Sequence, residues 1–217
     1  MVDIFDEVDE ELRAERAQQL LKRYAGLIIA AALLVIAATG GWQAWRWWQA
    51  RQDMAAGQRY LAAMALMQSP AAASNQQGIT DDFDALARTA PEGYRTLARL
   101  QAAALRAQHG DLKGATALWN DVASDSSADP LLRDLASLLW CQQQIDTGDP
   151  ALLEARLKAL AEPGNAWRAL AQEQLALLDL RQGRTEAAKT ALSKLAQDVT
   201  APNGVRERAA ALLARLG

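Results

Sequence analysis

The feature that most constrains this chain is an uncharged stretch of 22 residues, 24–45, which contains the apolar run AGLIIAAALLVIAATGGW. A helix needs about 20 apolar residues to cross a hydrocarbon layer of about 30 Å, so this length predicts one membrane span. A helix buried in a globular core would be shorter and would carry a polar stripe. A cleaved signal peptide would pair an apolar run of about 7–15 residues with a short basic segment. The segment before the apolar run, residues 1–23, is longer than that of a signal peptide and is acidic rather than basic, so we expect an uncleaved anchor.

The charges on either side of this stretch predict its orientation. Four basic residues precede the stretch and three follow it: Arg13, Arg16, Lys22 and Arg23 on the N-terminal side, and Arg46, Arg51 and Arg59 on the C-terminal side. Because the more basic flank stays in the cytoplasm, we expect a cytoplasmic N-terminus and an exported C-terminal part. In a bacterium this describes a single-pass protein of the cell inner membrane with a periplasmic domain.

The overall charge argues against a nucleic-acid partner. The net charge of −3 arises from residues 1–23, which contain seven acidic and four basic residues. The charges of the other 19 basic and 19 acidic residues cancel. No basic stripe is left over to bind phosphates. The only cysteine, Cys141, cannot form a disulfide within the chain, so the fold depends on packing.

A cluster of tryptophans follows the apolar run, where the sequence reads GGWQAWRWW. Amphipathic indole rings collect at the boundary between lipid and water, and arginine extends towards the headgroups. We expect this cluster to be a membrane-interface anchor, and the alternative is a face that also contacts a protein partner. The anchor residues are Trp42, Trp45, Arg46, Trp47 and Trp48.

The rest of the chain is predicted to be helical. Prolines stand where helical apolar patterns begin, glycines stand where they end, and no stretch alternates with the period of a β-strand. The expected helices cover 43–68, 80–90, 92–108, 111–124, 129–146, 150–161, 165–181, 184–197 and 203–216.

Three of the predicted helical hairpins resemble one another: QHGDLKGATALW, DTGDPALLEARL and RQGRTEAAKTAL. Their turn glycines lie 38 and 35 residues apart, close to the period of about 34 of tetratricopeptide repeats. Such repeats require a small residue five positions after the glycine, where Leu153 departs from the pattern, and a large apolar one nine positions after it. The turn and packing positions are Gly110, Ala115, Trp119, Gly148, Leu157, Gly183, Ala188 and Leu192.

The predicted fold is therefore all-α, with one N-terminal transmembrane helix followed by an α-solenoid of degenerate tetratricopeptide-like hairpins. The expected segments are a cytoplasmic acidic tail (1–23), the transmembrane helix (24–45), a juxtamembrane helix with a linker (46–79) and a periplasmic repeat domain (80–217). Trp140 and Trp167 are interpreted as packing residues between hairpins, with peptide binding as the alternative.

No residue constellation in the sequence points to catalysis. His109, the single histidine, precedes a turn glycine, and Cys141 has no base nearby in sequence. Phosphate-binding glycine loops are absent, and the DDFD segment (81–84) lacks the glycine and distal glutamate of a calcium loop. We expect no catalytic residue, no metal, no cofactor and no small-molecule substrate, and the protein is predicted not to be an enzyme.

The order of VDIFDEVDEELRAER, LLKRY, GGWQAWRWWQ, GYRTLARLQAAALRAQHGDLKGA and RERAAALLARLG along the chain resembles the YfgM-like family. Members of this family are tetratricopeptide-like ancillary subunits of the SecYEG translocon, and the resemblance is to the form seen in alphaproteobacteria. The resemblance implies an inner-membrane adaptor whose partners are the translocon, periplasmic chaperones or exported proteins, besides the lipid bilayer. The alternative is an envelope scaffold that organises outer-membrane assembly or cell-division complexes.

Overall fold

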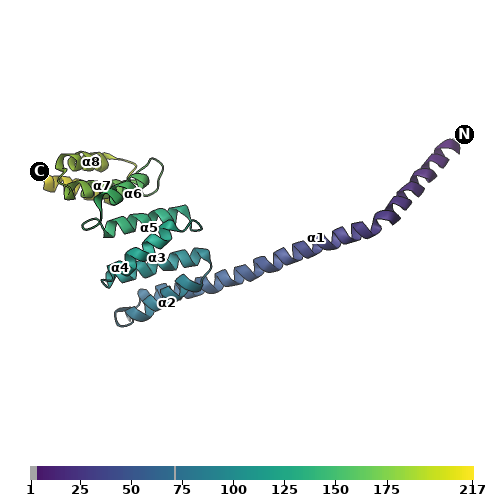
Figure 1. Ribbon diagram of the computed structural model, residues 1–217, viewed down its shortest axis with the longest axis horizontal. Helices are drawn as coiled ribbons and strands as arrows, with labels where there is room; N and C mark the ends of the chain where they lie inside the picture. The colour runs from purple at the N-terminus through teal and green to yellow at the C-terminus, as the bar shows by residue number, and fades with distance from the viewer. Residues whose placement is uncertain (1–3, 71) are drawn as a thin grey trace. The chain divides into compact units, whose positions relative to one another are not determined.

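The computed structural model describes residues 4–70 and 72–217, with side chains described for residue 23 onward except Ile28 and Ala71, and all regular secondary structure in these ranges is helical. No strand occurs in these ranges, so the all-α prediction is confirmed (Figure 1). The elements are α1 (Ile4–Met67), the short 3-10 helix η1 (Ala72–Ser74), α2 (Gln76–Thr89), α3 (Glu92–Gln108), α4 (Leu112–Ser124), α5 (Pro130–Gln143), α6 (Pro150–Leu160), α7 (Arg168–Arg181), α8 (Thr185–Gln197) and α9 (Asn203–Leu216).

The first helix is longer than any helix expected from the sequence. The predicted span and juxtamembrane helix form one element, because no proline interrupts the chain before Pro70. The chain divides into two compact units, Met1–Gln52 and Asp53–Gly217. In the first unit the large apolar side chains described between residues 24 and 52 are exposed. The side chains of the predicted acidic tail, except Arg23, lie outside the described residues.

The last turns of α1 belong to the core of the second unit. Ala56 and Ala63 are buried against α2 and α3, and the ring of Tyr60 meets Phe83 edge-on at 5.6 Å between centroids. Gly57 permits the close approach, since a Cβ atom there would lie 2.6 Å from the Tyr94 hydroxyl oxygen. Residues 53–67 are thus part of the packed domain, although the sequence placed them in a separate juxtamembrane segment.

Consecutive helices from α2 to α9 pack side by side, and the hairpins α3–α4, α5–α6 and α7–α8 follow one another along the stack (Figure 1). Short connections make neighbouring helices antiparallel. Aspartate side chains cap three of these helices: Asp111 accepts from the Gly114 amide at 2.9 Å, and Asp129 and Asp149 cap α5 and α6. Pro130 and Pro150 begin α5 and α6, where a missing N–H costs nothing.

The second unit contains a longer internal repeat of 73 residues, the distance between the turn glycines Gly110 and Gly183. With this offset the first and last residues of α5 correspond to those of α9. Buried residues of the two cores correspond in the same register, and the matching pairs are Ala103 with Ala176, Ala115 with Ala188, Trp119 with Leu192, Val122 with Leu195, and Ala136 with Ala209.

Matching turns connect α4 to α5 and α8 to α9. Asp125 accepts hydrogen bonds from the amide and hydroxyl of Ser127, at 3.1 and 2.6 Å. Asp198 accepts the same pair of bonds from Thr200, at 2.9 and 2.6 Å. The Asp125 carboxylate also forms an ion pair with Arg99 of α3, at 3.1 Å, and the Asp198 carboxylate forms one with Arg168 of α7, at 2.7 Å. Both turns therefore lock onto the first helix of their hairpin.

One pair of corresponding positions differs in chemistry. Leu100 and Leu135 belong to the same apolar cluster between α3 and α5. Their counterparts are Glu173 and Arg208, where the guanidinium donates to both carboxylate oxygens at 2.7 and 2.6 Å. The Glu173 side chain is only 5% exposed, so this two-bond ion pair fastens α9 to α7 at the end of the array.

Candidate functional site

The predicted interface anchor lies on the exposed surface of α1. The four tryptophans Trp42, Trp45, Trp47 and Trp48 are between 53% and 61% exposed. The rings of the first two approach to 5.9 Å, and the Arg51 guanidinium stacks 3.9 Å above the Trp47 ring. The helix from Arg23 to Met67 is long and apolar enough to cross a membrane, by length and composition.

Two of the three turn glycines adopt the conformation that favours glycine. Gly110 and Gly183 have φ angles of 84° and 74°, in the left-handed region. Gly148 lies outside that region. Its importance is steric instead, because a Cβ atom there would lie 2.9 Å from the Gln144 carbonyl oxygen and 3.3 Å from Leu153. Leu153, which stands where the repeat pattern requires a small residue, thus packs directly against Gly148.

The predicted packing positions lie in the hairpin cores. Ala115, Leu157, Ala188 and Leu192 are completely buried, and Trp119 is 4% exposed. They form the inner surface of the stack and offer nothing to a ligand.

Trp140 and Trp167 lie between hairpins and are held by polar contacts. Arg156 stacks 3.9 Å above the Trp140 ring and donates to Asn120 Oδ1 at 2.8 Å, so it joins α4, α5 and α6. The Trp167 indole donates to the Leu131 carbonyl oxygen at 3.0 Å. These contacts fit the packing interpretation of both rings.

The two residues considered for chemistry differ in their exposure. His109 is exposed at the C-terminal end of α3. Cys141 is fully buried in α5, and burial raises the pKa of its thiol to about 11. A thiol with so high a pKa stays protonated and is a poor nucleophile at neutral pH.

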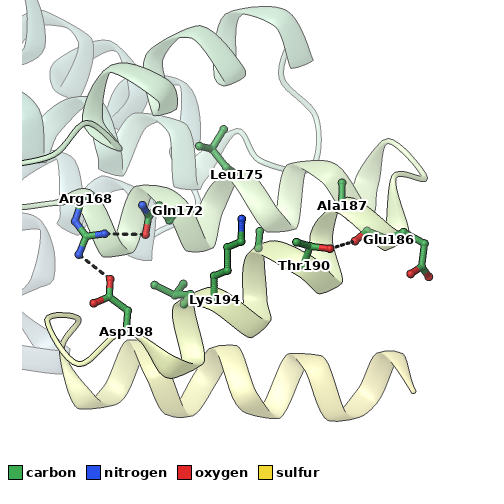
Figure 2. Close-up of a pocket in the computed structure, with 10 residues that line it drawn as sticks. Arg168, Gln172, Leu175, Glu186, Ala187, Thr190, Lys194 and Asp198 are labelled. Carbon is green, nitrogen blue, oxygen red and sulfur yellow. Dashed lines mark hydrogen bonds and ion pairs between the residues drawn. The ribbon is translucent and has the colours of Figure 1, made fainter.

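A trough of about 800 Å³ opens between α7 and α8, and no sequence signal pointed to it (Figure 2). Its floor is made of small and apolar side chains, because α8 presents alanines at 187 and 191 opposite Leu175. Polar residues stand around it, and the main ones are Arg168, Gln172, Thr190, Lys194 and Asp198. Repeat periodicity marks which residues pack inside a hairpin, but it says nothing of where a short side chain leaves a hollow.

Of the two basic side chains at the trough, Arg168 has an acidic partner and Lys194 has none among the described residues. Arg168 is occupied by Asp198 at 2.7 Å, by the Thr200 hydroxyl at 2.8 Å and by Gln172 at 3.4 Å. The Thr200 hydroxyl and then Arg168 lower the pKa of Asp198 to about 2, so this carboxylate is ionised at neutral pH. Lys194 rises from α8 into the open space, and within the described part of the chain no acidic side chain pairs with it (Figure 2).

The stack of antiparallel hairpins, its buried repeat positions and its surface trough together define a helical-repeat protein of the kind that binds other proteins. A family model described as a tetratricopeptide repeat-like domain matches residues 18–138, more than half of the chain. The chain therefore belongs to the tetratricopeptide repeat-like domain family. No curated protein and no solved structure matches it significantly.

Proposed function

We propose that this protein is an adaptor of the bacterial inner membrane that associates with the Sec translocon and periplasmic chaperones. It assists the transfer or folding of exported proteins by protein–protein contact, without catalysis. The observation that carries the proposal is the combination, in one chain, of an exposed apolar helix ending in a tryptophan cluster and a repeat domain with an open trough. The resemblance of the segment order to YfgM-like proteins supports the choice of partners.

In this proposal the four segments have separate tasks. Residues 1–23 lie in the cytoplasm and 24–45 span the membrane, and 46–79 continue into the periplasmic repeat domain of 80–217, against which residues 53–67 pack. The cluster from Trp42 to Trp48 sets the depth of the helix at the interface. The anchor confines the repeat domain to the membrane surface, which raises its effective concentration for polypeptides that emerge there.

Orientation is tested with a reporter that is active only in the periplasm, fused after Gly217. We expect activity, together with protection of a tag at residue 1 from protease added to spheroplasts. A well-expressed fusion that stays silent, with an accessible N-terminal tag, would contradict the proposed localisation.

Partners are tested by photo-crosslinking in cells from exposed leucines of the repeat domain. Leu112, Leu131 and Leu152 are each more than 40% exposed and lie on three different helices. We expect adducts with translocon subunits, chaperones or exported chains, and none from the buried control position Leu157. Adducts confined to outer-membrane assembly or division factors would favour the envelope scaffold instead.

A further inference from the structure

The last turns of α1, which belong to the second unit, carry an exposed apolar face. Met54 and Leu61, two turns apart, are 66% and 68% exposed, and Leu66 is 41% exposed. The other exposed large apolar side chains of this unit lie singly on separate elements. The exposed positions of these turns include two polar residues only, Gln58 and Arg59. Because the opposite side is packed in the core, the helix is apolar on both sides, which is typical of a helix that is covered all round.

A hollow of about 380 Å³ continues this face between α1 and α2. Its floor is made of alanines and leucines, namely Ala62, Ala63, Leu66, Ala85 and Leu86. Two opposite charges line it, Arg59 on α1 and Asp82 on α2, and neither forms an ion pair within the part of the chain whose side chains are described. The apolar face and this hollow together form what we term the α1–α2 edge.

The two ends of the stack differ in polarity. At the far end, α9 exposes the charged residues Glu207, Arg208 and Arg215. A terminal repeat has no neighbour on its outer side and needs a polar surface there to stay soluble. The outer side of α9 meets this requirement, whereas the α1–α2 edge, at the opposite end of the second unit, does not (Figure 1). This edge is therefore the one that needs a cover.

We propose that the α1–α2 edge binds the same edge of a second copy of this chain, with the two α1 helices parallel and Arg59 of each copy paired with Asp82 of the other. A contact between identical patches must be self-complementary, because each residue meets its partner twice across the twofold axis. An edge with one free cation and one free anion on an apolar surface satisfies this condition. The second copy supplies both the apolar helix and the two missing counter-charges.

This inference rests on the membrane anchor of the proposed function. Anchored copies cross the bilayer in the same direction, so their edges meet in parallel and at the same height. The apolar face, residues 54–66, is about 20 Å long, which is short for a dimer in free solution. Confinement to the bilayer raises the effective concentration of the copies, so a contact of this length suffices.

The test is disulfide formation between copies of the full chain in membranes isolated from cells that express it with two different tags. Leu61→Cys places a thiol on the proposed contact, and Leu112→Cys, an exposed leucine of α4, is the matched control. The native Cys141 is buried. After addition of an oxidant, we expect Leu61→Cys to link the two tagged copies at least about tenfold faster than Leu112→Cys. Met54→Cys should do the same, and it keeps the test valid if Leu61→Cys disturbs the fold.

The two charges supply the sharper comparison. In the background of Leu61→Cys, Arg59→Glu or Asp82→Arg places like charges together at both symmetric pairs and should slow the crosslinking about tenfold. The double variant exchanges the charges and should restore the rate. Arg88→Glu, on the exposed surface of α2 away from the hollow, is the control that should change nothing.

Three results would overturn the inference. They are equal rates for the cysteine on the edge and the control cysteine, rates that the single charge reversals leave unchanged, and adducts of Leu61→Cys with a different protein in place of a second copy. Monomeric chains that still crosslink to translocon partners from Leu131 would refute the dimer and leave the proposed function standing.

Discussion

Removing Arg208 should loosen the last helix of the array. Arg208→Ala leaves the carboxylate of Glu173 in a nearly closed site after the loss of two short hydrogen bonds. Breaking a fully buried ion pair costs about 3–5 kcal/mol. The Arg208 side chain is 54% exposed, so water replaces part of what it supplied. We therefore expect a loss of about 2 kcal/mol, between the value for a buried pair and the value for a surface pair.

Hydrogen exchange measured by mass spectrometry is the suitable assay, because helices of a repeat array open locally. A loss of about 2 kcal/mol corresponds to about thirtyfold faster exchange in the α9 peptides, with little change in α3 and α4. Arg215→Ala, which removes an exposed arginine from the last turn of the same helix, is the control.

The internal repeat supplies a stricter control. The double variant Glu173→Leu with Arg208→Leu restores the apolar pair found at Leu100 and Leu135. Well-packed apolar residues can replace a buried ion pair without loss, so the double variant should exchange as slowly as the wild type or more slowly. Equal exchange in Arg208→Ala and Arg215→Ala, or a double variant as labile as Arg208→Ala, would refute the reasoning.

Three further outcomes are expected. Gly183→Ala forces alanine to a φ of 74° and should cost about 1 kcal/mol in urea unfolding, whereas Gly93→Ala, inside α3, should not destabilise. Asp198 has a pKa lowered from 3.8 to about 2, so the stability it contributes is present above about pH 4 and is lost as the pH falls towards 2. The difference in melting temperature between wild type and Asp198→Asn should shrink over that range, and a constant difference would count against it. Cys141 should resist alkylation at pH 7.5 until urea unfolds the domain, and rapid labelling of the folded protein would contradict its burial.

Local signals were sufficient to predict most of the helices. Prolines at helix starts placed α5 and α6, and their observed first residues, Pro130 and Pro150, lie within a residue of the expected ones. These signals act through neighbouring backbone groups, so they can be read from a short window. The end of α5 was placed too late, because residues 144–147 form turns that carry no proline or glycine.

Contacts between distant helices were beyond the reach of the sequence pattern. Glu173 looks like an ordinary surface residue in QEQLALL, and only the packing of α9 shows that it is buried and paired. Ala191 likewise looks like any alanine of a helical repeat, and the trough follows from the side chains that face it. Periodicity identifies the apolar face of one helix, but the shape of a site depends on which faces meet.

The matching turns at Asp125 and Asp198 make the array extensible. A second copy of residues 126–198 spliced in after Asp198 would place Ser126, Ser127 and Ala128 after that aspartate, which recreates the turn at the new junction. The original turn into α9 would remain intact at the other end. The chain thus already contains a reusable turn, but an inserted copy would also need Glu173→Leu in the copy before it, because Leu135 would then stand where Arg208 pairs with Glu173.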